Sequence, residues 1–358
     1  MRTKKIMEFM KKNSMELSIL VSSGSYNPNF FYLSGFDGVG VLVIKKSGIP
    51  LLMVPDAEYN IAKREIRKRG NSSIVKICNT GKSRITEIIK KSFSRALNGK
   101  VGLDFGFMSL NQFNSIKKVL GIKKCGDISK RLLQLREIKE KYEISLLKKS
   151  CSISEKIINK FIKKVKQFNT EAEAAAFLVY EVNKLGLTTS FEPIVASSKN
   201  TGKWHHKPST SRIKKGFLLL DFGLKYNGYC SDITRTVYLG NPNKKEIELY
   251  NKVDDTQNKC IGMIVPGASF AAIQKYAEER LGKYYVHALG HGIGLEIHES
   301  PDLGHFSKSI VKEGMVLAVE PGIYFPYQFG VRIEDDVVVT KSGTKAITKK
   351  NRELLVIK

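Results

Sequence analysis

The chain has 358 residues, and its content of 42% hydrophobic and 26% charged residues is that of a folded globular protein. At about 100–200 residues per domain, this length predicts two domains. No apolar run reaches the roughly 18 residues that a membrane-spanning helix needs, and no apolar signal-peptide core follows the basic N-terminus. We therefore expect a cytoplasmic protein without a membrane segment.

The charge is unusual, because 60 Lys and Arg residues against 34 Asp and Glu residues give a formal net charge of +26. A charge of this size suggests a nucleic acid as partner. The lysines lie in short, scattered bursts, however, and no nucleic-acid-binding motif accompanies them, so we expect a lysine-rich solvated surface instead. The five cysteines are scattered and form no C-x-x-C pair, which predicts free thiols and argues against a cysteine zinc site.

The first third of the chain predicts strands that alternate with helices. In chain order these are strands at 41–44 and 51–54 around a turn at 46–48, a helix at about 59–68, a strand at 73–77, a helix at 85–97 and a strand at 101–103. The alternation predicts a sheet that is covered by helices.

The pattern changes near Gly126. From 128 to 165, apolar residues recur at spacings of three and four, which predicts amphipathic helix. Thr170-Glu171-Ala172-Glu173 is typical of a capping box, and it predicts a helix to about residue 185. Two further helices are predicted near 244–263 and 269–281, the second with Ser269 as N-cap.

Two aspartates are predicted to share one face of a β-hairpin. An apolar strand ends at Asp221, and Asn227-Gly228 is a strong signal for a two-residue hairpin turn. That turn places position 221 opposite 234 and position 223 opposite 232, so Asp221 and Asp232 project from the same face. Two close carboxylates repel each other unless a proton or a cation lies between them, so the pair indicates a metal site.

Three of the six histidines, His287, His291 and His298, lie within 12 residues. The first two have the spacing of a helical zinc motif, but its Glu is missing and the glycines at 290, 292 and 294 oppose a helix. We expect an extended segment with close backbone approach instead. Three histidines in a Gly-rich run favour a functional role over a structural one.

Further acids lie near the C-terminus. Glu320 follows a predicted apolar strand, and Glu334 shares a strand face with Arg332. For Asp335 and Asp336 we expect exposed acids at a strand end. The candidate ligands are then four carboxylates and one histidine, an oxygen-rich set that suits a pair of divalent ions, Mn, Co or Zn.

In this order the candidates resemble the pita-bread metallopeptidase family, which includes prolidase, aminopeptidase P and methionine aminopeptidase. The family pattern is D-x-G, a second Asp about eleven residues later, H-x-x-x-H-x-x-G, E-P-G and R-x-E. The matching segments are Asp221-Phe-Gly, Asp232, His287-Ala-Leu-Gly-His291-Gly-Ile-Gly, Glu320-Pro-Gly and Arg332-Ile-Glu334.

The resemblance extends over nearly the whole chain. Phe31-Tyr32-Leu33-Ser34-Gly35-Phe36 is similar to the Y-L-T-G-F stretch of the N-terminal domain of prolidase, aminopeptidase P and creatinase, and 135–144 matches the segment that opens the catalytic domain. The resemblance implies an α/β (α+β) protein with a creatinase/prolidase-like N-terminal domain at 1–128 and a pita-bread catalytic domain at 129–358.

The branch of the family follows from what the chain carries. Methionine aminopeptidases generally lack the N-terminal domain, and creatinase and the histone- or RNA-binding members lack the metal ligands. The resemblance therefore implies a peptidase for the bond that precedes proline, and the chain length favours a prolidase acting on Xaa-Pro dipeptides. The alternatives are an aminopeptidase P acting on longer Xaa-Pro peptides and, from another class, a basic non-catalytic member that binds nucleic acid or a protein.

The family also implies a homodimer and two divalent ions per chain, with Mn favoured. Asp221 would bind one ion, His291 and Glu320 the other, and Asp232 and Glu334 would bridge them. Glu320 would also be the general base for the attacking water. Arg332, beside the substrate, would hold Glu334 or a neighbouring acid in place.

Outside the ligands, His287 and His298 match family histidines that bind substrate or transfer protons. A third such histidine is either His205 or His206, and the sequence that follows favours His205. Trp204 stands where the family commonly has a smaller residue. It either narrows the site for the substrate's N-terminal side chain or packs beneath the loop.

Overall fold

The computed structural model describes residues 2–69, 74–349 and 353–358. The chain divides between Leu135 and Arg136, inside α6 (Ser129–Glu137), into two compact units. No helix within the described ranges is both long and apolar enough to cross a membrane.

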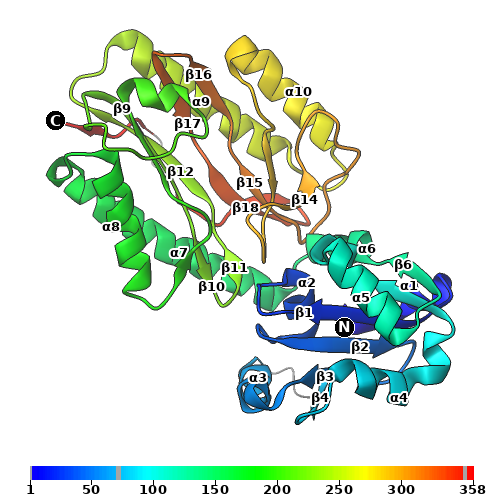
Figure 1. Ribbon diagram of the computed structural model, residues 1–358. Helices are drawn as coiled ribbons and strands as arrows, with labels where there is room; N and C mark the ends of the chain where they lie inside the picture. Colours follow the sequence, from blue (N-terminus) through cyan, green and yellow to red (C-terminus); the bar gives the residue numbers. More distant parts are fainter. Residues whose placement is uncertain (1, 70–73, 350–352) are drawn as a thin grey trace. The chain divides into compact units, whose positions relative to one another are not determined.

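The first unit, Met1–Leu135, is a six-stranded sheet with helices packed against it (Figure 1). Its strand order is β4-β3-β2-β1-β5-β6, in which β1, β2 and β3 are antiparallel and the outer pairs are parallel. The elements before α6 are α1 (Arg2–Lys12), β1 (Met15–Ser22), α2 (Pro28–Ser34), β2 (Gly40–Lys45), β3 (Leu51–Val54), α3 (Asp56–Lys68), β4 (Lys76–Asn79), α4 (Ile85–Leu97), β5 (Lys100–Leu103), η1 (Phe105–Phe107), α5 (Leu110–Leu120) and β6 (Lys124–Asp127).

Helices α4 and α5 share an apolar core with the sheet of this unit. Val43, Val101 and Leu103 of the sheet pack against Ile89 of α4 and Leu120 of α5. Strands that alternate with helices were expected here, and the predicted strand 51–54 and helix 85–97 have the observed bounds. The predicted strand at 73–77 begins at residue 73, which lies outside the described residues, and β4 begins at Lys76.

The second unit, Arg136–Lys358, consists of two halves, each of which has two helices followed by strands (Figure 1). The first half contains α7 (Lys141–Lys164), η2 (Val165–Gln167), α8 (Glu171–Asn183), β7 (Thr188–Thr189), β8 (Ile194–Ser197), η3 (Ser198–Gly202), β9 (Gly216–Phe222), β10 (Leu224–Tyr226), β11 (Tyr229–Cys230) and β12 (Ile233–Leu239). The second contains α9 (Lys244–Met263), α10 (Phe270–Leu281), η4 (Gly282–Tyr284), β13 (Gly290–Gly292), β14 (Glu299–Asp302), β15 (Val316–Val319), β16 (Gly322–Phe325), β17 (Phe329–Arg332), β18 (Asp335–Thr340), β19 (Gly343–Ala346) and β20 (Val356–Ile357).

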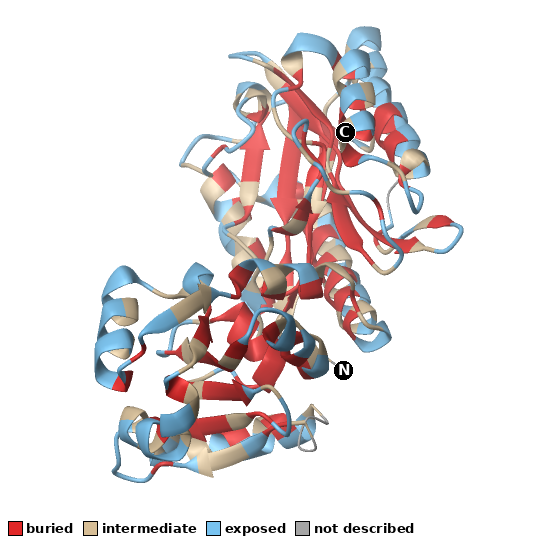
Figure 2. Ribbon diagram, turned by 90° about the vertical axis from the view of Figure 1, so that its right-hand side faces the viewer, coloured by how far each residue is buried: buried red, intermediate tan, exposed pale blue. Residues whose placement is uncertain are grey.

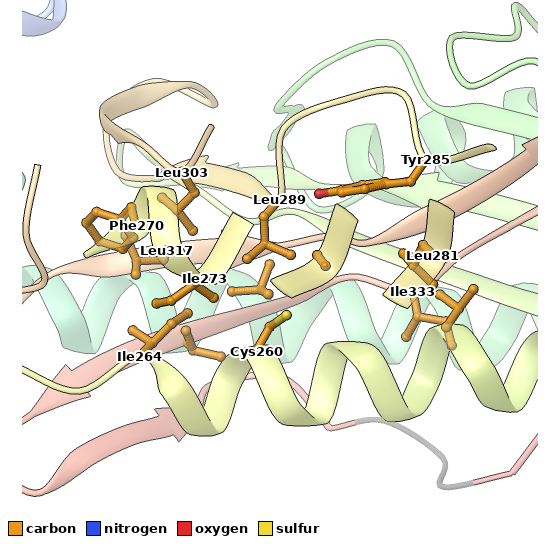
Figure 3. Close-up of a cluster of buried hydrophobic side chains, with 14 of the residues drawn as sticks. Cys260, Ile264, Phe270, Ile273, Leu281, Tyr285, Leu289, Leu303, Leu317 and Ile333 are labelled. Atoms are coloured by element: carbon orange, nitrogen blue, oxygen red, sulfur yellow. The ribbon is translucent and has the colours of Figure 1, made fainter. Parts of the chain in front are cut away.

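Each half buries the outer face of a sheet under its own helices. Phe161 of α7 and Leu178 of α8 pack against Leu218 and Leu220 of β9, within the sheet β20-β12-β9-β8. In the other half, α9 and α10 cover the sheet β14-β13-β15-β18-β19, and Figure 3 shows Leu317 of β15 within that apolar cluster. Figure 2 shows most strands of this unit as buried and its helices with one exposed side. The inner faces of the two sheets are therefore left for polar side chains.

The hairpin predicted around Asn227-Gly228 has the expected register. Tyr226 pairs with Tyr229, and Asp221 of β9 pairs with Thr234 of β12. Asn227 and Gly228 both have positive φ angles, 50° and 89°, as the two central residues of a type I′ hairpin turn require.

Two predicted helix caps differ in detail from the structure. Thr170 caps α8 by accepting from the Glu173 backbone N–H, but the Glu173 carboxylate accepts from the N–H of Asn169, so the reciprocal half of the capping box is absent. Ser269 precedes α10 without a side-chain cap bond, and its backbone bridges to Ile310 instead.

Candidate functional site

The five predicted ligands converge because each lies at or beside a strand end on an inner sheet face. In β9, Leu218, Leu220 and Phe222 point toward α7 and α8, so Asp221 lies on the opposite face. Asp232 lies two residues before Thr234, which pairs with Asp221, so all three share that face.

The second half supplies the other three ligands. His291 lies in β13 opposite Ala318 of β15. Leu317 and Val319 of β15 belong to the cluster under α9 and α10, so the alternation places Ala318 and the following Glu320 on the inner side. Glu334 follows β17, and its backbone N–H donates to the carbonyl of Thr234 across the two halves of this unit.

The ligand atoms of these side chains lie close together. One ligand atom from each of Asp232, His291 and Glu334 lies within 4.8 Å of the others. The Nε2 atom of His291 is 3.6 Å from Asp232 Oδ2 and 3.7 Å from Glu320 Oε1. The charge of Asp221 acts on the pKa of Asp232, Glu320 and Glu334, so the fifth predicted ligand belongs to the same group.

The His291 ring is oriented so that one nitrogen is available as a ligand. Its Nδ1 atom is 3.1 Å from the Gly292 carbonyl, which can only accept, so Nδ1 carries the proton. Burial, together with the charge of His298, lowers the pKa of His291 to about 3, so the ring is neutral at physiological pH. Its Nε2 lone pair therefore faces the carboxylates, as in metal-binding histidines.

The carboxylates lie close together, and some of their oxygens lack hydrogen-bond partners among the described residues. Bound cations would supply the missing partners. Burial, followed by the charges of Glu334 and Asp221, raises the pKa of Asp232 well above its ordinary value. Burial, then the charges of Glu320 and Asp221, does the same to the pKa of Glu334. In the described part of the chain, the buried Oδ1 atoms of Asp221 and Asp232 have no hydrogen-bond partner. A set of hard oxygen donors with such free atoms fits divalent ions.

Arg332 connects the carboxylates to His287. Its Nη2 donates to Asp221 Oδ2 at 2.7 Å, and its Nη1 donates to the Tyr324 hydroxyl at 2.9 Å. The Tyr324 hydroxyl lies 2.9 Å from His287 Nε2, while His287 Nδ1 is 2.8 Å from the Ala288 carbonyl. Because Nδ1 must donate to that carbonyl, Tyr324 donates its proton to Nε2. Burial lowers the pKa of His287 to about 4, so this ring too is neutral.

Of the other histidines, His298 lies beside the candidate metal centre, and His205 and His206 lie in the loop that follows η3. The His298 ring lies edge-on to His291, with ring centroids 4.4 Å apart, and burial and the charge of His205 lower the His298 pKa. His205 stacks on Trp204, which is 42% exposed and also stacks on His287. His206 is buried, and its Nε2 lies 2.7 Å from a carboxylate oxygen of Glu171.

The expectation that Asp335 and Asp336 are exposed is wrong. Both are buried, at 2% and 0% exposure, because β18 is an inner strand between β15 and β19. Asp335 points toward α9 and accepts from Arg235 and Gln257. Asp336 points the other way, and its Oδ2 accepts from the backbone N–H of Asp232 at 3.0 Å.

Sequence reasoning also missed the residues that orient the ligands. The Thr234 hydroxyl donates to Glu334 Oε2 at 2.7 Å and accepts from Arg332 Nε at 3.1 Å. Its spacing of two from Asp232 on a strand was a usable signal, because it places both on one face. Tyr324 carried no comparable signal, since its role depends on where β16 and β17 place it beside Arg332.

Comparisons with known proteins agree with this arrangement. Residues 2–138 match the creatinase/prolidase N-terminal domain, and residues 145–341 match metallopeptidase family M24. A Xaa-Pro dipeptidase of Pyrococcus horikoshii is 34% identical over an alignment of 365 residues that covers 99% of this chain and 98% of that protein.

Solved structures extend the likeness to the fold. The prolidase from Pyrococcus horikoshii OT3 has a TM-score of 0.86 at 33% identity, with 99% of both chains covered. The X-Pro aminopeptidase from Thermotoga maritima MSB8 has a TM-score of 0.89 at 29% identity, with 96% of this chain and 98% of that chain covered. The predicted fold is thereby confirmed, with a creatinase-like domain before a pita-bread domain. The chain belongs to metallopeptidase family M24.

Proposed function

We propose that this metallopeptidase hydrolyses the peptide bond that precedes proline, with Xaa-Pro dipeptides as its main substrates. The observation that carries the proposal is the convergence of four carboxylates and a neutral histidine on the inner faces of two sheets. Xaa-Pro dipeptidases that are about one-third identical along nearly the whole chain support the choice of substrate.

For the metal centre we propose two divalent ions, with Mn favoured over Co and Zn. Asp221 would hold one ion, His291 and Glu320 would hold the other, and Asp232 and Glu334 would be shared by both. The unpartnered oxygens of Asp221 and Asp232 and the free Nε2 lone pair of His291 support this assignment. When bound, such ions polarise the scissile carbonyl and lower the pKa of a water toward neutrality.

Side chains of the protein then carry out the proton transfers. Glu320 is the most exposed of the four carboxylates, with its side chain 22% exposed against 12% for Asp221, so it can reach both a water and an entering substrate. We assign it the role of general base. Its backbone N–H donates to the Leu289 carbonyl at 2.8 Å, which fixes it beside the histidine segment.

The bond before proline presents a particular difficulty, because its nitrogen carries no hydrogen and must gain a proton as it leaves. His287 and His298 are assigned to stabilise the charge that develops on the carbonyl oxygen and to help deliver this proton. Because Nε2 of the neutral His287 accepts from Tyr324, His287 can do either only after Nε2 has taken up a proton, such as the one that the general base removes from the attacking water. His205, stacked on Trp204, completes the histidine side of the site.

We further propose that the protein is a cytoplasmic homodimer. Each of the five cysteines is free, as is usual for a protein in a reducing compartment. Light scattering coupled to gel filtration tests the dimer, because a monomer at all concentrations would contradict it.

The test of the proposed function is hydrolysis of Ala-Pro and of Ala-Pro-Ala by protein supplied in turn with Mn, Co and Zn. We expect metal-dependent release of proline from the dipeptide at a higher kcat/KM than cleavage of the tripeptide. Preference for the tripeptide would identify an aminopeptidase P instead. The charge of +26 favours one rival, a nucleic-acid-binding protein, and salt-dependent retention on DNA without peptidase activity would establish that rival.

A further inference from the structure

The segment that carries Trp204 and His205 is a tight turn. The His206 backbone N–H donates to the Lys203 carbonyl at 3.2 Å, which makes Trp204 and His205 the two central residues. The Trp204 carbonyl accepts from Arg332 Nη1 at 3.1 Å, so the tip of the turn is joined to the arginine that holds Asp221.

The two rings at the tip of this turn stack on each other, and one of them, that of Trp204, also lies against His287. The Trp204 and His287 rings are nearly parallel, with centroids 5.6 Å apart and 6° between their planes. Trp204 and His205 have centroids 4.0 Å apart and planes 19° apart. Trp204 thus contacts two of the three proposed substrate-facing histidines, His205 and His287, so their surroundings depend on where the turn holds this indole.

The base of the turn is tied to a fully buried carboxylate. Glu171, the first residue of α8, is 0% exposed. Its Oε1 accepts from the Ser197 N–H at 2.8 Å and from Asn200 Nδ2 at 2.9 Å, and its Oε2 lies 2.7 Å from His206 Nε2. One carboxylate therefore ties β8, the η3 segment and the turn to the start of a helix.

We propose that His206 is a positioning residue, which with Glu171 fixes the turn 203–206 so that Trp204 lies against His287 and His205 lies against Trp204. The burial of His206 and its bond to Glu171 separate it from the substrate-facing role that its sequence position also permitted. The statement about the turn stands on the contacts alone, and only its effect on turnover rests on the proposed function.

The chain offers a direct probe, because Trp204 is its only tryptophan. His206→Gln and His206→Asn form a matched pair of amides. The Gln side-chain nitrogen is four bonds from Cα, as is His Nε2, and so can still donate to Glu171, whereas the Asn nitrogen is one bond shorter. His305→Ala is the control, since His305 is an exposed histidine that pairs with Glu278.

The measurements are acrylamide quenching of Trp204 fluorescence in the metal-loaded protein without substrate, and kcat and KM for Ala-Pro. We expect His206→Asn to raise the quenching constant and to lower kcat/KM about 10- to 100-fold, the cost of a small misplacement of reacting groups. In His206→Gln we expect a quenching constant and a kcat/KM that are both close to the wild-type values. His305→Ala changes neither, and all variants keep the wild-type metal content.

Unchanged quenching in folded His206→Asn would overturn the proposal, and so would equal defects in the Asn and Gln variants. A lower melting temperature with wild-type quenching and kinetics would also overturn it, because it would mean that the pair serves stability alone. If the wild type lacks Xaa-Pro hydrolysis while His206→Asn still exposes Trp204, the proposed function falls and the role of His206 in the turn stands.

Discussion

Replacing Asp232 by Asn tests whether the crowded carboxylates of the candidate centre lower the stability of the metal-free protein. Ligand atoms of Asp232 and Glu334 lie within 4.8 Å, so two full charges there repel by about 3.5 kcal/mol at an effective dielectric constant of about 20. Either acid can relieve part of this repulsion by taking up a proton. The free-energy cost of that protonation is about 1.4 kcal/mol for each unit by which the pH exceeds the pKa of the acid. We therefore expect a net gain of about 1–3 kcal/mol from the neutral amide, within the range set by that repulsion.

The assay is thermal unfolding of wild type and Asp232→Asn, first with a chelator and then with Mn. For a unit of this size a gain of 1 kcal/mol raises the melting temperature by about 2–4 °C, so the metal-free variant unfolds at a higher temperature than the metal-free wild type. With Mn the order reverses, because the variant cannot share a carboxylate between two cations. Its metal content falls from about two ions per chain toward one or none, on the two-ion mechanism, and its peptidase activity is lost.

Two results would refute this reasoning. A metal-free variant that is less stable than wild type would mean that the carboxylates do not repel each other in the folded chain. A variant that binds two ions and turns over substrate at the wild-type rate would remove Asp232 from the centre.

Three further predictions concern other side chains of the second unit. His291→Ala should lose metal and regain some activity with excess Mn, whereas His287→Ala should keep its metal and lose about 10²–10⁴-fold in kcat, so equal metal loss in both would contradict the assignment. Arg332→Ala should destabilise the metal-free protein by about 3–5 kcal/mol in denaturant unfolding, because it leaves a buried carboxylate without its partner; a wild-type midpoint would refute this. Burial alone would raise the pKa of Glu299, but nearby cations, Arg136 foremost, lower it below 4.5. This stabilisation is therefore present above pH 4.5 and lost as the pH falls through the lower folded value, so Glu299→Gln should be less stable than wild type at pH 7 and the difference should shrink in acid.

The sequence predicted the parts of the site that depend on local geometry. The register of the hairpin follows from a two-residue turn and the alternation of a strand, so the shared face of Asp221 and Asp232 could be derived before the structure was known. The extended conformation of the His291 segment followed from its glycines. Each of these inferences needed only residues that are close in the chain.

The remaining features depend on contacts between distant segments. Asp336 looks like any acid at a strand start, and only its placement between β15 and β19 buries it beneath Asp232. The distinction between His205 and His206 likewise depends on Glu171, a helix residue more than 30 positions away whose burial no local pattern reveals. Tertiary neighbours, rather than propensity, decide such positions.

The most direct test of the central claim is a titration of chelator-treated wild-type protein with Mn, in which bound metal and Ala-Pro hydrolysis are measured in the same samples. The proposed centre predicts no hydrolysis without metal and activity that follows occupancy and saturates at about two ions per chain. Full activity in the metal-free protein, or saturation with metal without any hydrolysis of Ala-Pro, would contradict it.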